Sequence, residues 1–228
     1  MTAIVELRNA TKLVKSGFDE EKIILNDVSL DIHEHDFITI LGGNGAGKST
    51  LFNVIAGTLP LTSGSIHILG ENVTHFSPEK RAKYLSRVFQ DPKMGTAPRM
   101  TVAENLLIAK FRGEKRGLVP RGLNSYREEF QATIEKIGNG LDKHLDTPIE
   151  FLSGGQRQAL SLLMATLKRP ELLLLDEPTS NLDSLNEGII LKSLTEGAED
   201  KTIVMVTHRE SSKSRGDVII EMDNSRKS

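Results

Sequence analysis

Short runs of apolar and β-branched residues recur along the chain, separated by Gly, Asp and His. Runs of this length and composition predict β-strands. The expected strands lie at residues 4–7, 28–32, 37–41, 65–68, 172–175 and 202–207. The first 70 residues are therefore predicted to be mainly β, and strands return in the last third of the chain.

Helical periodicity lies between these strands. After Gly47, the apolar residues Leu51, Val54 and Ile55 fall on one helical face, and Gly57 ends the pattern. Further helices are expected at residues 102–109, 126–137, 154–169 and 186–194. Because strands and helices alternate, the fold class is α/β with a largely parallel core sheet. We expect one domain over residues 1–228, with a catalytic core at 1–90 and 151–228 and an inserted helical subdomain at 91–150.

Composition narrows the functional classes. The 228 residues are 38% apolar, which is enough for a proper core. A net charge of −2 gives no general reason to expect nucleic-acid binding. The absence of cysteine excludes disulfides and thiolate metal sites. The apolar runs are far shorter than the roughly 20 residues of a membrane span, and the first residues lack a secretory pattern, so we expect a cytoplasmic chain.

A glycine-rich segment at residues 42–49, the phosphate loop, follows the expected strand at 37–41 and precedes a helix. Two glycines with four residues between them, followed by Lys48 and Ser49, form the pattern that surrounds nucleotide phosphates with backbone amides. Lys48 is expected to bind the β- and γ-phosphates, and Ser49 to bind Mg²⁺. The candidate nucleotide-binding residues here are Gly42, Gly43, Asn44, Gly45, Ala46, Gly47, Lys48, Ser49 and Thr50.

Two acids, Asp176 and Glu177, follow the apolar strand at 172–175. Side chains at the end of a parallel strand emerge at the ligand-binding edge of the sheet. Four leucines before an acid also occur in ordinary core strands, but the phosphate loop favours a chemical role. Asp176 is therefore expected to hold Mg²⁺, and Glu177 to polarise the water that attacks the γ-phosphate.

A second glycine-rich helix start lies at residues 152–156, the signature segment, where Ser153 is placed as the N-cap. Its candidate nucleotide-binding residues are Ser153, Gly154, Gly155 and Gln156. One chain thus offers two phosphate-binding helix starts, but only one has a lysine and a hydroxyl for a metal-bound triphosphate. The simplest arrangement holds each nucleotide between two chains.

The signature segment, followed by the acidic strand and residues 178–183, resembles the ATP-binding subunits of ABC transporters over nearly the whole chain. The resemblance implies a P-loop NTPase fold of the ABC type with an N-terminal antiparallel β part. It also implies a head-to-tail, ATP-dependent homodimer, in which Ser153, Gly154 and Gly155 of one copy contact the γ-phosphate held by Lys48 of the other.

The resemblance assigns further roles. It implies that Gln90 senses Mg²⁺ and the attacking water, that residues 181–183 cross the dimer interface, and that His208 contacts the γ-phosphate. Family members carry an aromatic residue that stacks on adenine. The aligned position here is Val14, and the nearest aromatic, Phe18, either provides that platform or belongs to local packing.

The resemblance implies integral membrane permease subunits as partners and a location at the cytoplasmic face of a bacterial membrane. Residues 89–105 resemble importer ATPases, which also use an extracytoplasmic solute-binding protein. Residues 176–183 and 218–223 instead resemble export and lipoprotein-release ATPases. Import is the favoured interpretation, export is the alternative, and a non-transport ABC ATPase is a third, weaker one.

Overall fold

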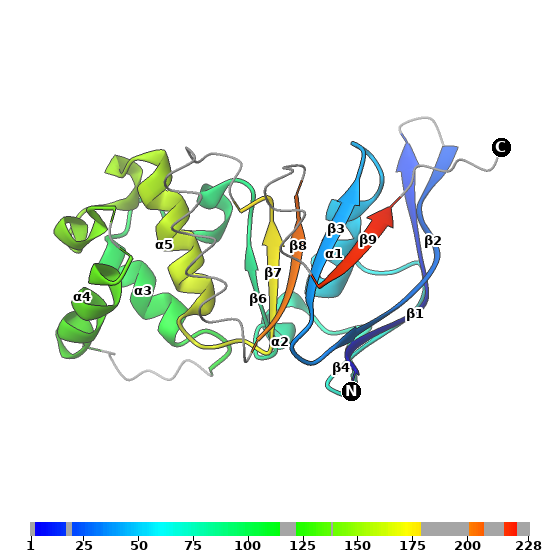
Figure 1. The fold of residues 1–228 in the computed structure, drawn as a ribbon, viewed down its shortest axis with the longest axis horizontal. Coiled ribbons are helices and arrows are strands. Elements are labelled where there is room, and N and C mark those ends of the chain that lie inside the picture. Colours follow the sequence, from blue (N-terminus) through cyan, green and yellow to red (C-terminus); the bar gives the residue numbers. More distant parts are fainter. Residues whose placement is uncertain are drawn as a thin grey trace.

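The fold is seen in a computed structural model, which describes residues 3–16, 20–114, 122–137, 139–178, 201–207 and 217–222. Three parts follow one another across the molecule: an antiparallel sheet, a parallel sheet with helix α1 (Lys48–Ala56) against it, and a group of helices (Figure 1). The predicted α/β class and the predicted combination of a parallel and an antiparallel sheet are confirmed.

The parallel sheet has the strand order β6-β7-β8-β3-β9, and every neighbouring pair in it is parallel. Its strands are β3 (Phe37–Gly42), β6 (Leu85–Val88), β7 (Leu172–Asp176), β8 (Thr202–Val206) and β9 (Val218–Met222). The carboxyl ends of all these strands therefore meet at one edge, where ligands bind in open α/β sheets.

The sequence patterns missed β6 and β9. β6 is only four residues long and contains Ser86 and Arg87, so no continuous apolar run marks it. β9 does carry a short β-branched run at residues 218–220, but Val218 and Ile219 are exposed, and among the described strands it lies at the sheet edge beside β3. Short strands with polar residues inside them carry little periodicity.

The antiparallel sheet has the order β2-β1-β4-β5, made from β1 (Ala3–Ser16), β2 (Glu20–His33), β4 (Ser63–Ile68) and β5 (Glu71–Asn72). β1 and β2 extend well beyond the expected strands, because polar residues such as Lys15 and Glu21 pair across them. Opposite charges on facing positions favour such pairing. Irregular register along β1 breaks the period-two pattern that would have revealed it.

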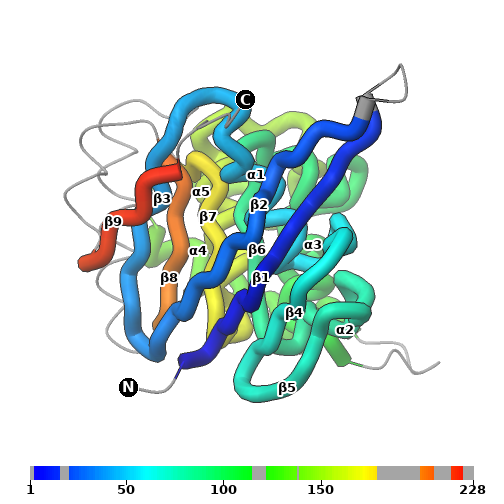
Figure 2. Tube along the Cα trace, turned by 90° about the vertical axis from the view of Figure 1, so that its right-hand side faces the viewer, coloured from blue at the N-terminus to red at the C-terminus, as the bar shows by residue number. Residues whose placement is uncertain are grey.

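Helix α1 lies between the two sheets (Figure 2). Leu51, Phe52, Val54 and Ile55 of α1 are at most 1% exposed, so this helix is buried on more than one face. On β7 the side chains alternate: Leu172 and Leu174 join the α1 core, while Leu173 and Leu175 pack in the core formed with α5 (Gly154–Thr166). Because of this alternation, Asp176, two residues after Leu174, lies on the face of the sheet that packs against α1.

The helical part contains α3 (Val102–Lys110) and α4 (Arg127–Glu135), which share a separate core with α5. The other short helices are α2 (Pro78–Arg81), η1 (Pro92–Gly95), η2 (Leu123–Tyr126), η3 (Leu141–His144) and η4 (Ile149–Phe151). The predicted helices at 102–109, 126–137 and after Ser153 are confirmed with slightly different ends. The helix expected at 186–194 lies outside the described residues.

A buried arginine closes the carboxyl end of α1. Arg81 is 2% exposed, and its NH1 donates to the carbonyl oxygens of Val54 and Ile55 at 2.6 and 2.8 Å, while NH2 donates to Thr74 at 3.1 Å. Burial lowers the pKa of Arg81 to about 10, so the guanidinium stays charged at neutral pH. A cation on the last carbonyls of a helix is favourable because it opposes the helix dipole.

We expect Arg81→Met to lower the free energy of unfolding by roughly 2–4 kcal/mol, because it removes three bonds from otherwise buried carbonyl oxygens. Chemical denaturation of the purified chain measures the change. Lys80→Met is the matched control, since Lys80 is an exposed cation next in sequence, and it should change the value by less than about 0.5 kcal/mol. Equal stabilities for the two variants would contradict the capping role.

Candidate nucleotide site

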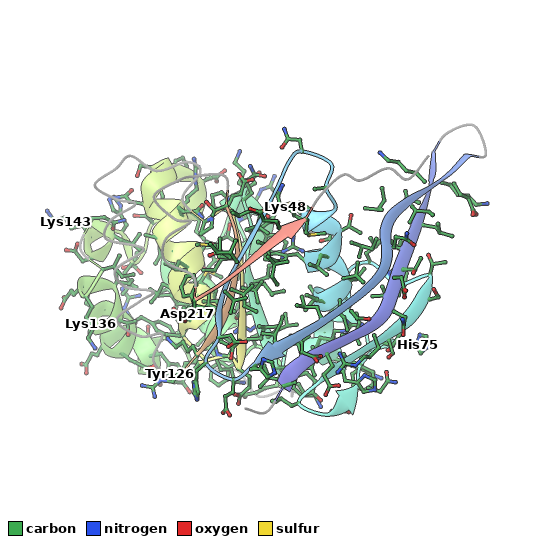
Figure 3. The ribbon with its side chains drawn as sticks, turned by 45° about the vertical axis from the view of Figure 1, so that its right-hand side comes forward. Lys48, His75, Tyr126, Lys136, Lys143 and Asp217 are labelled. Carbon is green, nitrogen blue, oxygen red and sulfur yellow. The ribbon has the colours of Figure 1, made fainter. Side chains whose placement is uncertain are left out.

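The predicted phosphate and metal residues meet at the carboxyl edge of the parallel sheet. Lys48 begins α1 directly after the phosphate loop, Asp176 ends β7, and Gln90 follows β6 by two residues. Figure 3 labels Lys48 beside the start of α1. Strands β3 and β7 are separated in this sheet by β8 alone, so residues far apart in sequence share one edge.

The phosphate loop turns tightly before α1. Gly47 has a left-handed conformation, with φ 92°, and the Ala46 amide donates to the Gly43 carbonyl at 3.2 Å. A Cβ on Gly47 would lie 3.0 Å from the carbonyl oxygen of Ile24, so backbone conformation and packing both favour glycine there. Gly43 differs, since a Cβ at that position would meet nothing within 4 Å. Steric packing within this chain therefore does not require glycine at position 43.

The Lys48 side chain folds back over the loop. It is 7% exposed, and its Nζ donates to the carbonyl oxygens of Gly42 at 2.6 Å and Gly43 at 2.9 Å. The ammonium is therefore held directly above the backbone that would surround a phosphate chain. It can exchange these carbonyls for phosphate oxygens, which accept stronger, charge-assisted hydrogen bonds.

Asp176 lies on the α1 face of the sheet, two residues after Leu174 on β7. Its Oδ2 accepts a hydrogen bond from NH2 of Arg87 at 2.8 Å, and both side chains are mostly buried. Within the described parts of the chain, the other carboxylate oxygen of Asp176 accepts no hydrogen bond. One oxygen of the carboxylate is therefore available for a ligand.

Glu177 is held in an unusual backbone conformation. Its φ of 45° is left-handed, which costs a non-glycine residue conformational energy and persists only where the surroundings fix it. The Glu177 amide donates to Val206 at 3.0 Å, and Nε2 of Gln158 on α5 donates to the next carbonyl, that of Pro178, at 2.7 Å. Nε2 of Gln90 donates to Oε2 of Glu177 at 3.0 Å. Backbone and side chain of the candidate base are thus both anchored.

The signature segment forms a fully capped helix start. The Gln156 amide donates to Oγ of Ser153 at 3.2 Å, and the Ser153 amide donates to Oε1 of Gln156 at 3.1 Å, which is a capping box. A Cβ on Gly154 would meet nothing within 4 Å. Helix α5 packs on the opposite face of the parallel sheet from α1. The two helices whose starts are predicted to bind anions therefore lie on opposite faces of the parallel sheet.

Three predicted features fall outside the described residues: Phe18, His208 and the segment 181–183. Arg87, Asn53 and Gln158 contact the site but were not predicted. A charged residue inside a short strand, three positions before Gln90, is a signal that could have indicated Arg87. Asn53 and Gln158 carry no such signal, because polar residues are ordinary on helices.

The residues present fit a small, hard divalent cation. Asp176 offers a carboxylate oxygen, Ser49 a hydroxyl at the second position of α1, and Gln90 an amide, which are all oxygen ligands of the kind Mg²⁺ prefers. A site with one carboxylate suits Mg²⁺ that is also bound by substrate phosphates.

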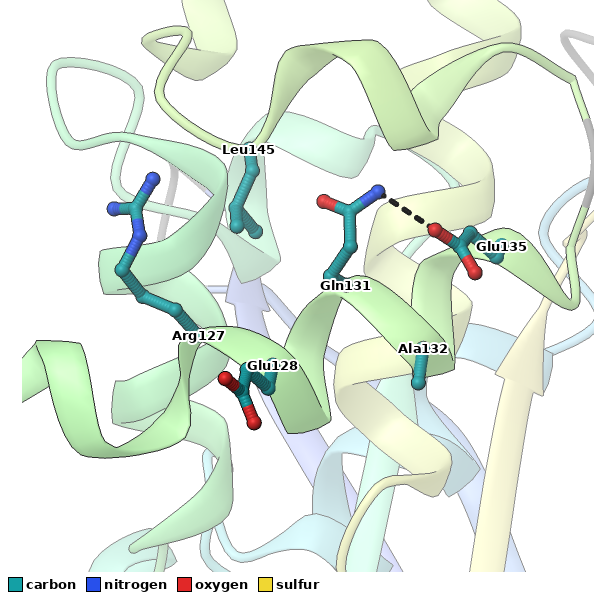
Figure 4. Close-up of a pocket in the computed structure, with 6 residues that line it drawn as sticks. All are labelled: Arg127, Glu128, Gln131, Ala132, Glu135 and Leu145. Carbon is teal, nitrogen blue, oxygen red and sulfur yellow. Dashed lines mark hydrogen bonds between the residues drawn. The ribbon is translucent and has the colours of Figure 1, made fainter.

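A separate surface hollow of about 410 Å³ is lined by side chains of α4 and by Leu145 (Figure 4). Within the hollow, Nε2 of Gln131 donates to Oε1 of Glu135 at 3.1 Å. The lining residue Arg127 forms an ion pair with Asp146. That pairing raises the pKa of Arg127 and lowers the pKa of the Asp146 carboxyl group. The hollow lies on the helical part of the molecule, away from the phosphate loop.

We expect Lys48→Ala to weaken ATP binding by about ten-fold or more, because the phosphates lose a buried cation while the backbone loop remains. Titration with a fluorescent ATP analogue measures the affinity. Lys136→Ala is the matched control, since Lys136 is exposed at the far end of the helical part (Figure 3) and should leave affinity unchanged. Equal affinities for both variants would place phosphate binding elsewhere.

No helix in the described parts of the chain is long and apolar enough to cross a bilayer.

Comparison with known proteins agrees with this geometry. Residues 25–180 match the ABC transporter family model. A tyrosine transport ATP-binding protein of Clostridioides difficile is 40% identical over 207 residues, which cover 90% of this chain and 82% of that protein. A lactococcin transport/processing ATP-binding protein of Lactococcus lactis is 33% identical, over 82% of this chain but 25% of its own length.

The solved structures extend the agreement to three dimensions. A dimeric post-hydrolysis state of the ATP-binding cassette MJ0796, bound to ADP and phosphate, superposes with a TM-score of 0.82 at 29% identity and covers 97% of both chains. Together with the family match and the geometry of the phosphate loop, this shows that the chain belongs to the ABC transporter family, as an ATP-binding and ATP-hydrolysing subunit.

Proposed function

We propose that this subunit works as a head-to-tail homodimer that binds two Mg·ATP and energises solute import through separate membrane permease subunits. The observation that carries the proposal is the pair of helix starts on opposite faces of the sheet, of which only one has a lysine. Gly43 and Gly154 both have open space where a side chain would fit, so their smallness serves a contact that a single chain does not contain.

Hydrolysis follows from the residues at the sheet edge. Lys48 would transfer from the loop carbonyls to the β- and γ-phosphates, where its charge opposes the charge developing on the transferred group. Ser49, Asp176 and Gln90 would hold Mg²⁺, which supplies further charge neutralisation when bound. Glu177 would orient a water and take its proton as the water oxygen bonds to the γ-phosphorus and the bond to the β-phosphate oxygen breaks. The products are ADP and phosphate.

The dimer completes each site. Ser153, Gly154 and Gly155 of one copy would direct backbone amides at the γ-phosphate bound by Lys48 of the other, so ATP stabilises the assembly and hydrolysis releases it. His208 would contact the same phosphate, residues 181–183 would cross the interface, and Phe18 would stack on adenine. The dimeric state of the ATP-binding cassette MJ0796, which this chain resembles, supports the arrangement.

A loop at residues 91–100, the docking loop, is suited to receive the membrane partner. Met94 on it is 69% exposed, and flexible, apolar methionine is common at protein interfaces. The buried side chain of Asn105 binds the backbone of Ala97 and Met100, which fixes the loop to α3. A force on the docking loop would therefore be transmitted to α3.

The docking loop is also hydrogen-bonded to the residues just before the signature segment. The amide of Ile149 donates to Met100 at 3.1 Å, and the amide of Glu150 donates to Pro98 at 3.0 Å. These bonds tie the docking loop to residues that end three positions before Ser153. Movement at the permease would thus displace the helix start that closes over ATP, which is the coupling a transporter needs. We propose residues 91–150 as the subdomain that receives the movement, and residues 1–90 and 151–228 as the core, whose helix start at Ser153 that subdomain displaces.

The docking loop and the residues after it resemble importer ATPases, which favours import and a partner solute-binding protein. Export remains the alternative because residues 176–183 and 218–223 resemble export-type ATPases. The test is reconstitution of the subunit with a candidate permease in vesicles, with ATP supplied on the subunit's side. Substrate moving toward the ATP side supports import, movement away supports export, and ATP hydrolysis that never responds to any permease contradicts the transport role.

A further inference from the structure

A buried ion pair connects the proposed metal ligand to the phosphate-loop helix. NH2 of Arg87 donates to Oδ2 of Asp176 at 2.8 Å, and NH1 of the same guanidinium donates to Oδ1 of Asn53 at 2.6 Å. The side chains of Arg87 and Asp176 are 9% and 12% exposed. Since Asn53 lies on α1, one side chain joins β6, β7 and the helix that begins at Lys48.

The sheet register produces this arrangement. Arg87 on β6 pairs with Leu174 on β7, and Asp176 lies two residues further along the same strand, so all three side chains point to the α1 face. The guanidinium also lies over the ring of Phe89, 4.7 Å from its centroid, and 5.8 Å from that of Phe52. Ring contacts on a cation, with hydrogen bonds to two acceptors, leave the guanidinium little freedom.

We propose that Arg87 is a positioning residue that orients the Asp176 carboxylate and limits its attraction for free divalent cations. By binding Oδ2, Arg87 leaves the other oxygen as the one available to a metal. A positive charge at hydrogen-bond distance also offsets the carboxylate charge, and in a mostly buried setting this repulsion of a divalent cation is weakly screened. The metal would therefore bind with nucleotide phosphates rather than before them. The inference rests on the proposed role of Asp176 in binding Mg²⁺.

Arg87→Met tests the charge. It keeps an unbranched side chain between the two phenylalanine rings but removes the guanidinium. We expect the Mg²⁺ concentration that half-saturates binding of a non-hydrolysable fluorescent ATP analogue to fall by about five-fold or more. Affinity for the analogue in EDTA should stay within about two-fold of wild type, because the phosphate loop is untouched. An unchanged or higher Mg²⁺ requirement would overturn the proposal.

Three further variants separate the possible causes. Arg87→Gln, which is neutral but can still donate hydrogen bonds, should lower the Mg²⁺ requirement as well, and it serves if the methionine variant folds poorly. Arg87→Lys, which keeps the charge, should retain the wild-type requirement. Lys83→Met removes an exposed cation four residues earlier and should have no effect. A purely structural role for Arg87 would lower thermal stability without changing the Mg²⁺ requirement, which would also overturn the proposal.

Asp176→Asn distinguishes failure of this inference from failure of the proposed metal site. If Asp176→Asn leaves the Mg²⁺ requirement unchanged, the metal site itself is wrong. If that variant raises the requirement while Arg87→Met matches wild type, only the role of Arg87 is wrong. In the Asp176→Asn background, Arg87→Met should change the Mg²⁺ requirement by a different factor than it does in wild type, because the effects of two side chains in direct contact are not additive.

Discussion

Replacement of Glu177 by glutamine is expected to lower ATP turnover by about 100-fold or more while ATP and Mg²⁺ binding stay within about two-fold of wild type. The amide keeps the size of the side chain and an oxygen that can accept the hydrogen bond from Gln90. It is a far poorer proton acceptor, so the attacking water loses its base. Steady-state ATPase rates, together with nucleotide titration, measure the two effects separately.

Glu171→Gln is the matched control for this variant. Glu171 is exposed just before β7, so the control makes the same charge change at the opposite end of one strand. Its turnover should equal that of wild type. If Glu177→Gln hydrolyses ATP near the wild-type rate, the base lies elsewhere. If it loses ATP binding along with turnover, Glu177 acts on the ground state rather than on the chemical step.

The parts of the fold that the sequence predicted are those with strong local patterns. The apolar run of β7, the helix after Gly47 and the capped helix after Ser153 each carry a local signal that tertiary packing reinforces. The core of the candidate site was predictable for the same reason, because the phosphate loop and the strand-end acids are continuous segments. Their meeting at one edge follows from the parallel sheet.

The remaining features depend on contacts between segments far apart in sequence. β6 is recognisable as a strand only through its pairing with β7. The anchoring of Glu177 uses Gln158, which lies 19 residues earlier on a different element, and its left-handed backbone has no signature in residue type. Likewise, Arg87 meets Asp176 across 89 residues. Such pairs require the register of the folded sheet, which local periodicity does not contain.

Gly154→Val, placed in the Glu177→Gln background, is expected to abolish the ATP-dependent dimer and to leave the fold of the monomer intact. A side chain at Gly154 has open space in the single chain, and the residue begins a helix, where replacing glycine carries no conformational penalty. In the proposed dimer the same side chain would fill the space that the γ-phosphate of the other copy needs. The variant therefore distinguishes a contact between chains from a contact within one.

The measurement is molecular mass by light scattering with and without ATP. Glu177→Gln alone should shift from monomer to dimer on addition of ATP, since bound nucleotide that is not hydrolysed stabilises the assembly. Gly122→Val in the same background is the matched control, because Gly122 lies next to a helix start on the helical part, with an ordinary backbone φ of −63°. This variant should dimerise normally. A Gly154→Val protein that still dimerises with ATP would show that Gly154 does not contact the nucleotide of the other copy. A Glu177→Gln protein that remains monomeric at saturating ATP would show that each nucleotide is held by one chain alone.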